Sequence, residues 1–179
     1  MGRAPKHAGV QVPSTRPITP ERAVTFSVGG RVCALPLDVV LEVQQIVQFA
    51  PLPAADPAVL GLLDVRGTVM PAFDLGQLLG LGAVPRTLET PMLVCRLRNG
   101  SACLVVDGVR DVVELASSCV HSTAELGDLA DGILGTCQVG DELVLLLDPE
   151  RVVPEEFGSA HADSEAPADS RMSSAVGRR

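Results

Sequence analysis

Hydrophobic residues along this chain fall into short runs, and Gly, Pro, Asn or Asp separates one run from the next. Short runs rich in Val, Leu and Ile and bounded by turn residues are typical of β-strands. The predicted strands are 24–28, 31–37, 42–49, 61–65, 68–73, 92–97, 102–106, 109–115, 132–139 and 143–147. The predicted short helical segments are 39–41, 75–81 and 149–157. The pattern therefore predicts an all-β fold with short helices.

The predicted strands form two similar sets of five. Residues 28–38 and 97–107 each contain a strand, a Gly-containing turn, a second strand and an Asp. The second hairpin of each set starts at a glycine, Gly61 in the first set and Gly132 in the second. This duplication predicts two five-stranded β-barrel subdomains related by a pseudo-two-fold axis, with a groove between them for a partner. The expected subdomain boundaries are about 23–88 and about 89–157.

The two ends of the chain differ from the predicted body. Residues 1–22 are rich in Pro and polar residues, and residues 158–179 are mainly Ala, Ser, Asp and Arg without an apolar face. Such composition cannot bury enough apolar surface to offset the entropy of ordering. We expect a disordered N-terminal arm and a disordered C-terminal tail around a folded body at 23–157.

Composition narrows the range of partners. The chain has 179 residues, a net charge of −8, four Phe, and neither Trp nor Tyr. Few aromatic rings disfavour base stacking, and an acidic body repels phosphate backbones and anionic lipid. No signal peptide and no apolar run long enough to cross a bilayer are present. We therefore expect a cytoplasmic protein that binds no nucleic acid and does not insert into a membrane.

The sequence contains few of the motifs that are typical of enzyme active sites. It contains no P-loop, no G-x-G-x-x-G and no G-x-S-x-G, and its five cysteines include no C-x-x-C pair. His121 stands alone in a predicted loop, and no His, Cys and carboxylate cluster has metal-ligand spacing. The cysteines are best interpreted as free thiols, mostly buried. The sequence thus predicts no catalytic residue, no cofactor and no metal.

One enzymatic alternative arises from the repeat. Asp74 and Asp148 follow equivalent strands, and aspartic hydrolases build their carboxylate pair from two related lobes in this way. The residues after the two aspartates are Leu-Gly and Pro-Glu, which do not make the tight Asp-Thr/Ser-Gly turn of that chemistry. Both aspartates are better interpreted as N-caps of short helices.

The most unusual local feature is an arginine at the tip of an apolar hairpin. Arg66 lies beside Gly67 in the segment 61–71. It is either a solvated turn charge or a partner of Glu42, which is the only charged residue in the run 39–47. The second interpretation is favoured, because an arginine fork on a shielded carboxylate gives geometric specificity.

Three motifs in order resemble the CheW-like family. The segment Gly61-Leu-Leu-Asp-Val-Arg-Gly, continuing to Asp74-Leu75, resembles the family signature G-x-x-N-L-R-G-x-x-x-P-x-x-D-L. Residues 40–43 resemble its V-x-E-I segment, and residues 106–112 resemble its V-D-x-V-x-x-V segment. The resemblance covers about residues 23–153 and implies two five-stranded SH3-like barrels.

The resemblance implies a non-enzymatic adaptor in bacterial chemosensory signalling. CheW couples chemoreceptors to the histidine kinase CheA, so the expected partners are a kinase regulatory domain and the cytoplasmic tip of a methyl-accepting receptor. The protein-binding residues implied by the motifs are Arg66, Glu42, Val40, Val43, Asp64, Gly67, Val106 and Val109.

This chain departs from the family pattern at two positions. Asp64 replaces the signature Asn, and Gly76 replaces an Arg that commonly follows Asp-Leu. The alternative hypothesis is therefore a diverged scaffold of another pathway that has lost receptor binding.

Overall fold

The computed structural model describes residues 21–53, 56–116, 120–121 and 132–158. The predicted arm up to residue 20 and the predicted tail from residue 159 lie outside these ranges, as does most of the loop that contains His121. Arg22, which was assigned to the arm, already belongs to the first strand.

Each predicted strand is present, with shifted ends. The strands are β1 (Arg22–Val28), β2 (Arg31–Pro36), β3 (Val40–Gln45), β4 (Val59–Val65), β5 (Thr68–Asp74), β6 (Pro91–Leu97), β7 (Gly100–Val105), β8 (Gly108–Glu114), β9 (Val120–His121), β10 (Ile133–Val139) and β11 (Glu142–Leu147). The helices are α1 (Leu75–Leu78), α2 (Pro149–Val152) and α3 (Glu155–Gly158). The strand β9 was not predicted.

The helical predictions need two corrections. The segment 39–41 forms no helix, because residues 37–39 make a turn and Val40 and Leu41 belong to β3. The helix predicted at 149–157 is two short helices that break at Pro154. Proline has no N–H to donate and disfavours helix in the residue before it, so Val153 is extended with ψ 129°.

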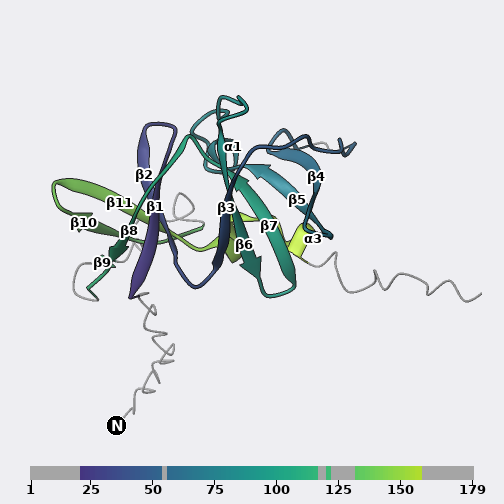
Figure 1. Cartoon of the computed structure of the whole chain (residues 1–179). Helices are drawn as coiled ribbons and strands as arrows, with labels where there is room; N and C mark the ends of the chain where they lie inside the picture. The colour runs from purple at the N-terminus through teal and green to yellow at the C-terminus, as the bar shows by residue number, and fades with distance from the viewer. Residues whose placement is uncertain (1–20, 54–55, 117–119, 122–131, 159–179) are drawn as a thin grey trace, which may run out of the picture.

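The strands form two sheets, shown side by side in Figure 1. Sheet A has the order β8-β1-β2-β11-β10-β9, and sheet B has the order β3-β6-β7-β5-β4. Each sheet takes strands from both halves of the chain. The expected division at about residue 88 is therefore wrong as a division between barrels: β3 leaves sheet A to pair with β6, and β8 leaves sheet B to pair with β1.

The two sheets nevertheless repeat one another. Exchanging β1 with β6, β2 with β7, β3 with β8, β4 with β10 and β5 with β11 converts the order of sheet B into the order of the first five strands of sheet A. Each sheet contains one parallel pair at the equivalent place, β2 with β11 and β7 with β5. The predicted pseudo-two-fold relation between two barrels is thus present in the topology.

A backbone bridge closes each barrel next to a glycine. Ala50 pairs with Leu62 in sheet B, and His121 pairs with Thr136 in sheet A. A Cβ added to Gly61 would lie 2.3 Å from the carbonyl oxygen of Ala50, and one added to Gly135 would lie 2.7 Å from that of His121. Gly135 is therefore the counterpart of Gly61, and the alignment of Gly61 with Gly132 was wrong.

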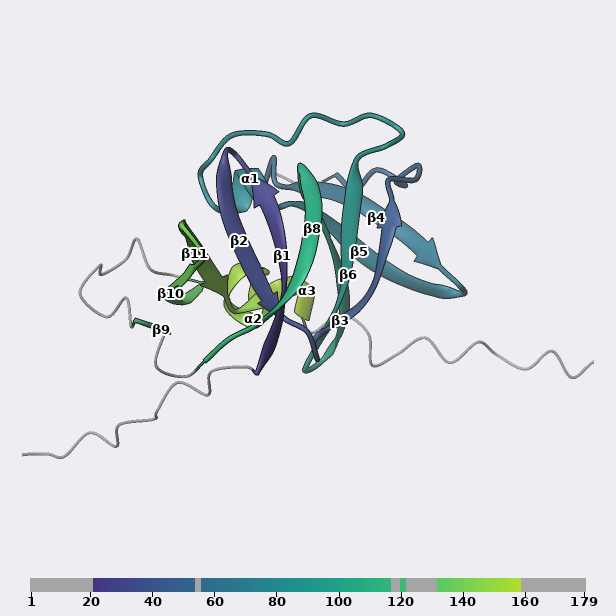
Figure 2. The same cartoon turned by 60° about the vertical axis from the view of Figure 1, so that its left-hand side comes forward.

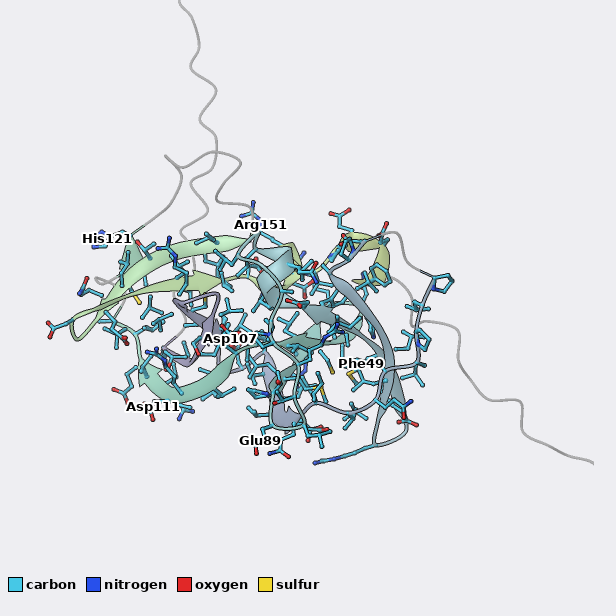
Figure 3. The ribbon with its side chains drawn as sticks, turned by 90° about the horizontal axis from the view of Figure 1, so that it is seen from above. Phe49, Glu89, Asp107, Asp111, His121 and Arg151 are labelled. Atoms are coloured by element: carbon cyan, nitrogen blue, oxygen red, sulfur yellow. The ribbon has the colours of Figure 1, made fainter. Side chains whose placement is uncertain are left out.

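The closing segments lie at opposite ends of the molecule. Seen from above, Phe49 marks the end of sheet B and His121 marks the end of sheet A (Figure 3). Asp107 lies near the middle, where its Oδ2 accepts a 2.7 Å hydrogen bond from the N–H of Gly29. This contact joins the β1–β2 turn to the start of β8.

The core is built almost entirely from aliphatic side chains. A larger cluster lies on both faces of β6 and extends to β1, and a smaller cluster around Val144 and Leu146 lies in sheet A. The segment after β11 crosses to sheet B, where Phe157 meets Phe73 edge to face with ring centroids 5.3 Å apart. This crossing ties the last strand of one barrel to the core of the other.

Asp74 and Asp148 are helix caps, as the sequence indicates. The Asp74 carboxylate accepts from the backbone N–H groups of Gln77 and Val84, and the Asp148 carboxylate accepts from that of Glu150. Asp74 is fully buried. The carboxylates therefore satisfy backbone donors at two different helices, an arrangement that gives no support to an aspartic hydrolase.

We predict that Gly61→Ala destabilises the protein by about 2 kcal/mol or more, because the added methyl meets backbone at a φ of 135°. The matched control is Gly30→Ala, which has a φ of 73° but open space around the position, and should cost only about 1 kcal/mol. Urea unfolding of both variants measures the difference. Equal losses would show that the close approach at Ala50 is unimportant.

Candidate protein-docking site

A two-residue turn presents the candidate arginine. Val65 pairs with Thr68, and Arg66 and Gly67 between them have φ values of 53° and 86°. Positive φ at both central residues is the geometry of a type I′ turn, which fits the twist of a hairpin. Within the described residues, Arg66 is the sole residue other than glycine with positive φ. Its backbone is therefore held in a conformation that side chains disfavour.

Arg66 pairs with Glu42, as the sequence suggested. Arg66 Nη2 lies 2.7 Å from Glu42 Oε2, and the two side chains are 81% and 21% exposed. The second Glu42 oxygen accepts a 2.5 Å hydrogen bond from Gln44 Nε2. The carboxylate is thus fixed from two sides, whereas most of the guanidinium faces solvent.

The ion pair connects two strands that are far apart in the order of sheet B. Glu42 lies on the edge strand β3, and Arg66 follows β4, the opposite edge. An exposed pair of this kind contributes at most about 1 kcal/mol to stability. Its main effect is to fix where the guanidinium lies, at the end of the hairpin that projects from the molecule in Figure 2.

Asp64 supports the same turn. Its Oδ1 accepts a 2.6 Å hydrogen bond from the N–H of Gly67, and the residue is exposed. Asp64, Arg66, Gly67 and Glu42 therefore form one contiguous group.

The four valines of the prediction differ in accessibility. Val43 is 47% exposed on the edge strand β3, and Val40 and Val109 are half-buried against the core. Val106 is fully buried, so it has no surface to offer a partner and its assignment as a contact is corrected to a supporting role in the core. The docking interpretation is therefore strongest at Val43.

Several exposed apolar residues were missed as site candidates. Leu41 on β3 and Val47 after it are 45% and 46% exposed, and together with Val43 they form an exposed row that the polar Gln45 interrupts. The remaining ones are Val69, Leu88, Val112 and Leu143. The alternation was visible in the sequence, but only the structure shows that the outer face of β3 is not covered by another described element.

A second ion pair lies in the other barrel. Arg110 Nη1 lies 2.8 Å from Glu142 Oε2, with side chains 40% and 58% exposed. It also joins the third strand of a repeat to the second hairpin, but here the strand supplies the cation and the hairpin supplies the anion. No pattern in the sequence predicts this pair, because Arg110 and Glu142 share no motif.

Burial disfavours the reactive thiolate form of the cysteines in the described core. Burial raises the pKa of Cys33 to about 11, with a smaller opposing effect from Arg31. Burial also raises the pKa of Cys103 to about 12, and the negative charge of Glu42 raises it further. Among the described residues, no group of three His, Cys, Asp or Glu side chains is placed to hold a metal ion, and no helix is long and apolar enough to cross a membrane.

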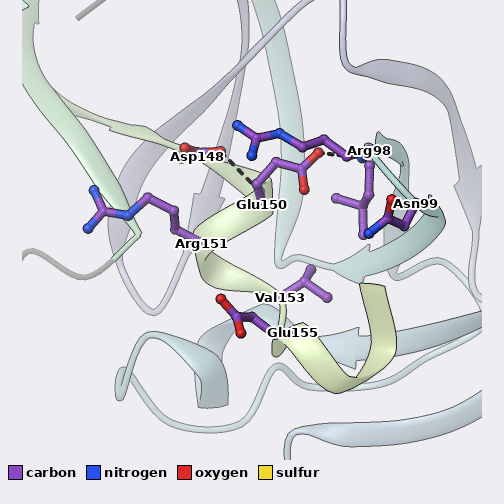
Figure 4. A pocket seen from close by; sticks show the side chains of 8 residues that line it. Arg98, Asn99, Asp148, Glu150, Arg151, Val153 and Glu155 are labelled. Carbon is purple, nitrogen blue, oxygen red and sulfur yellow. Dashed lines mark hydrogen bonds between the residues drawn. The ribbon is translucent and has the colours of Figure 1, made fainter. Parts of the chain in front are cut away.

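A hollow of about 510 Å³ lies between the β6–β7 turn and the two C-terminal helices (Figure 4). Its lining carries both signs of charge, including Arg98, Glu150 and Glu155. The backbone N–H of Arg98 donates a 2.5 Å hydrogen bond to Glu150 Oε1 across this hollow. These contacts link the turn to α2 and indicate no particular ligand.

Comparison with known proteins identifies the family. Residues 22–157 match the CheW-like domain. The chain belongs to the CheW-like family. Members of this family are non-enzymatic adaptors, and the protein is accordingly a CheW-like scaffold protein of chemotaxis.

The relatives of this CheW-like protein are distant. The chemotaxis protein CheW of Rhizobium meliloti is 25% identical over 138 residues, which is 74% of this chain and 87% of the relative. CheW of Bacillus subtilis is 27% identical over 107 residues, 60% of this chain and 69% of the relative. The crystal structure of the scaffolding protein TtCheW from Thermoanaerobacter tengcongensis has the same fold, with a TM-score of 0.68, 20% identity and coverage of 83% of this chain and 94% of that one.

We predict that Arg66→Gly is more stable than Arg66→Ala by about 1 kcal/mol. Both variants lose the ion pair, but alanine retains the cost of a left-handed backbone and glycine does not. Chemical denaturation of the two variants measures the difference. If the alanine variant equals or exceeds the glycine variant, the turn is not held in the left-handed conformation.

Proposed function

We propose that this protein couples a chemoreceptor to a CheA-type histidine kinase, as an adaptor that binds both. The observation that carries the proposal is the exposed Arg66, which Glu42 fixes on one face of β3, while the exposed Val43 lies on the other face of the same strand. The partners are the regulatory domain of the kinase and the cytoplasmic tip of a methyl-accepting receptor. In this role the protein works in the cytoplasm at membrane-associated receptor arrays.

The guanidinium of Arg66 suits recognition of another protein. An arginine has five N–H donors, and the contact with Glu42 leaves donors on an 81% exposed side chain. A carboxylate or a carbonyl of a partner can therefore be bound without breaking the internal ion pair. Because Glu42 already orients the side chain, binding loses less conformational entropy than a free arginine would.

The apolar row supplies the second part of the site. Leu41 and Val43 come directly before and after Glu42 on β3, so their side chains lie on the face opposite to Glu42. Val47 is exposed on the extension of the strand, after the polar Gln45. Apolar side chains on an edge strand fit the apolar face of a helix or a sheet edge of a partner. Single contacts of this size are weak, and the many repeated contacts of a receptor array would sum them.

A second candidate function is an adaptor that binds the kinase but no receptor. The observation in its favour is Gly76, which stands where the family commonly has Arg. A Cβ at this position would lie 2.2 Å from the carbonyl oxygen of Gly82, so the loop after α1 leaves no room for a side chain there. Binding to the kinase regulatory domain without binding to any receptor tip would select this candidate.

We predict that Arg66→Ala weakens binding to the kinase regulatory domain or the receptor tip about tenfold, the effect of losing one charge-assisted hydrogen bond. Isothermal titration with purified partners from the same organism measures the change. Arg31→Ala removes an exposed arginine from the β1–β2 hairpin and serves as the control. No binding of either partner by the wild-type protein in the micromolar range would refute the proposal.

We also predict that Val43→Ser weakens the same binding several-fold, whereas Leu88→Ser has no effect. Both changes remove an exposed aliphatic side chain, but Val43 lies on β3 and the 85% exposed Leu88 lies in the loop before β6. The affinity lost on removing an apolar side chain increases with the area of that side chain that the partner covers. Equal effects of the two substitutions would exclude β3 as the docking strand.

A further inference from the structure

Arg66 occupies a backbone position that the other repeat gives to glycine. The matching turn joins β10 to β11, and its first central residue is Gly140 with a φ of 59°, close to the 53° of Arg66. A side chain at such a φ is held against its own preference, and it persists where the surroundings enforce it. Something in the β4–β5 turn must therefore supply the constraint that the β10–β11 turn does not need.

Asp64 is the residue placed to supply it. Its Oδ1 accepts the 2.6 Å hydrogen bond from the N–H of Gly67, so the side chain spans the turn and holds Arg66 between its two anchor points. An aspartate or asparagine that accepts from a backbone N–H a few residues on is a recognised way to fix a turn. Once φ is fixed, the direction of the Cα–Cβ bond of Arg66 is fixed as well.

Asp64 takes part in neither of the ion pairs that the described residues form. The two ion pairs found among the described residues are Arg66 with Glu42 and Arg110 with Glu142. At the matching place in the second repeat, Gln138 donates its Nε2–H to the carbonyl oxygen of Gly140 at 3.3 Å. The first central residue of that turn has no side chain to direct, and the flanking Gln138 offers a donor in place of an acceptor.

We propose that Asp64 is a positioning residue for Arg66. It acts through the N–H of Gly67, holds residue 66 in the left-handed conformation and thereby directs the guanidinium to Glu42. It does not itself contact the partner. The proposal rests on the function proposed for Arg66, and it assigns Asp64 a role that depends on its acceptor oxygen and not on its charge.

The chain offers a matched pair of substitutions. Asp64→Asn keeps an Oδ1 acceptor of the same shape and removes the charge. Asp64→Ala removes both the acceptor and the charge. A positioning role through Gly67 predicts that the asparagine variant behaves as the wild type and that the alanine variant does not.

The first experiment needs no partner. Nuclear magnetic resonance follows the exchange of the Gly67 amide hydrogen and the side-chain signals of Arg66. In Asp64→Ala we expect at least tenfold faster exchange at Gly67 and averaged guanidinium signals, and in Asp64→Asn we expect wild-type values for both. Unchanged Arg66 signals in the alanine variant would overturn the proposal, whatever the protein binds.

The second experiment measures binding to the kinase regulatory domain. We expect Asp64→Ala to lose as much affinity as Arg66→Ala, about tenfold, and Asp64→Asn to stay within about twofold of the wild type. The double variant Asp64→Ala with Arg66→Ala should bind no more weakly than Arg66→Ala alone. If the affinity lost by the double variant equals the product of the two single losses, Asp64 acts on the partner directly. The same conclusion follows if Asp64→Asn binds as weakly as Asp64→Ala.

The two experiments separate the proposals. If the wild-type protein binds neither kinase nor receptor, the proposed function fails while the resonance measurement still decides the role of Asp64. Unfolding curves recorded for both variants show whether a loss of binding arises from a loss of fold.

Discussion

The exchange of third strands between the two repeats is the constraint from which this architecture follows. β3 pairs with β6 and β8 pairs with β1, so neither repeat completes a sheet from its own strands. A large aliphatic cluster then extends from β1 to both faces of β6, and the C-terminal helices cross back to sheet B. The two barrels form one cooperative body, because removing either half would leave an unpaired edge on the strands of the other.

Closure of the barrel in sheet B positions the Arg66–Glu42 pair. Beyond β3 the backbone of Ala50 meets Leu62, and this approach is possible because Gly61 has no side chain. With the two edges of sheet B brought together, Glu42 on β3 comes within reach of the hairpin that carries Arg66. The ion pair is too exposed to stabilise the barrel much. The ion pair can form because the barrel closes, and it holds the Arg66 guanidinium at a defined place on the surface.

The strands, the duplication and the Arg66–Glu42 pair could be predicted, because each depends on a short run of residues or on a motif that can be recognised in the sequence. Alternating apolar runs around Gly29-Gly30 and Asn99-Gly100 show hairpins regardless of how the hairpins later pair. The exchange of β3 and β8 was missed, because a third strand has the same apolar pattern whichever hairpin it joins. Val106 is implied as a contact by the resemblance to the family motif, and a motif match does not show whether a side chain is exposed or buried. Gly132 was aligned with Gly61 on the similar triplets Gly-Leu-Leu and Gly-Ile-Leu, although Gly61 and Gly135 stand at the same distance before Asp74 and Asp148.

The two repeats have diverged where they meet solvent and have stayed alike where they close. Gly61 and Gly135 retain the same close approach to a neighbouring carbonyl, since any side chain there would open a barrel. The hairpin tips differ: Arg66 in one repeat corresponds to Gly140 in the other. The ion pair of sheet B has its cation on the hairpin, whereas that of sheet A has its cation on the strand. A left-handed turn favours glycine, so the arginine is held at a cost in stability that only a function away from folding explains. Because the hairpin tips differ in this way, the two barrels present chemically different ends on one fold.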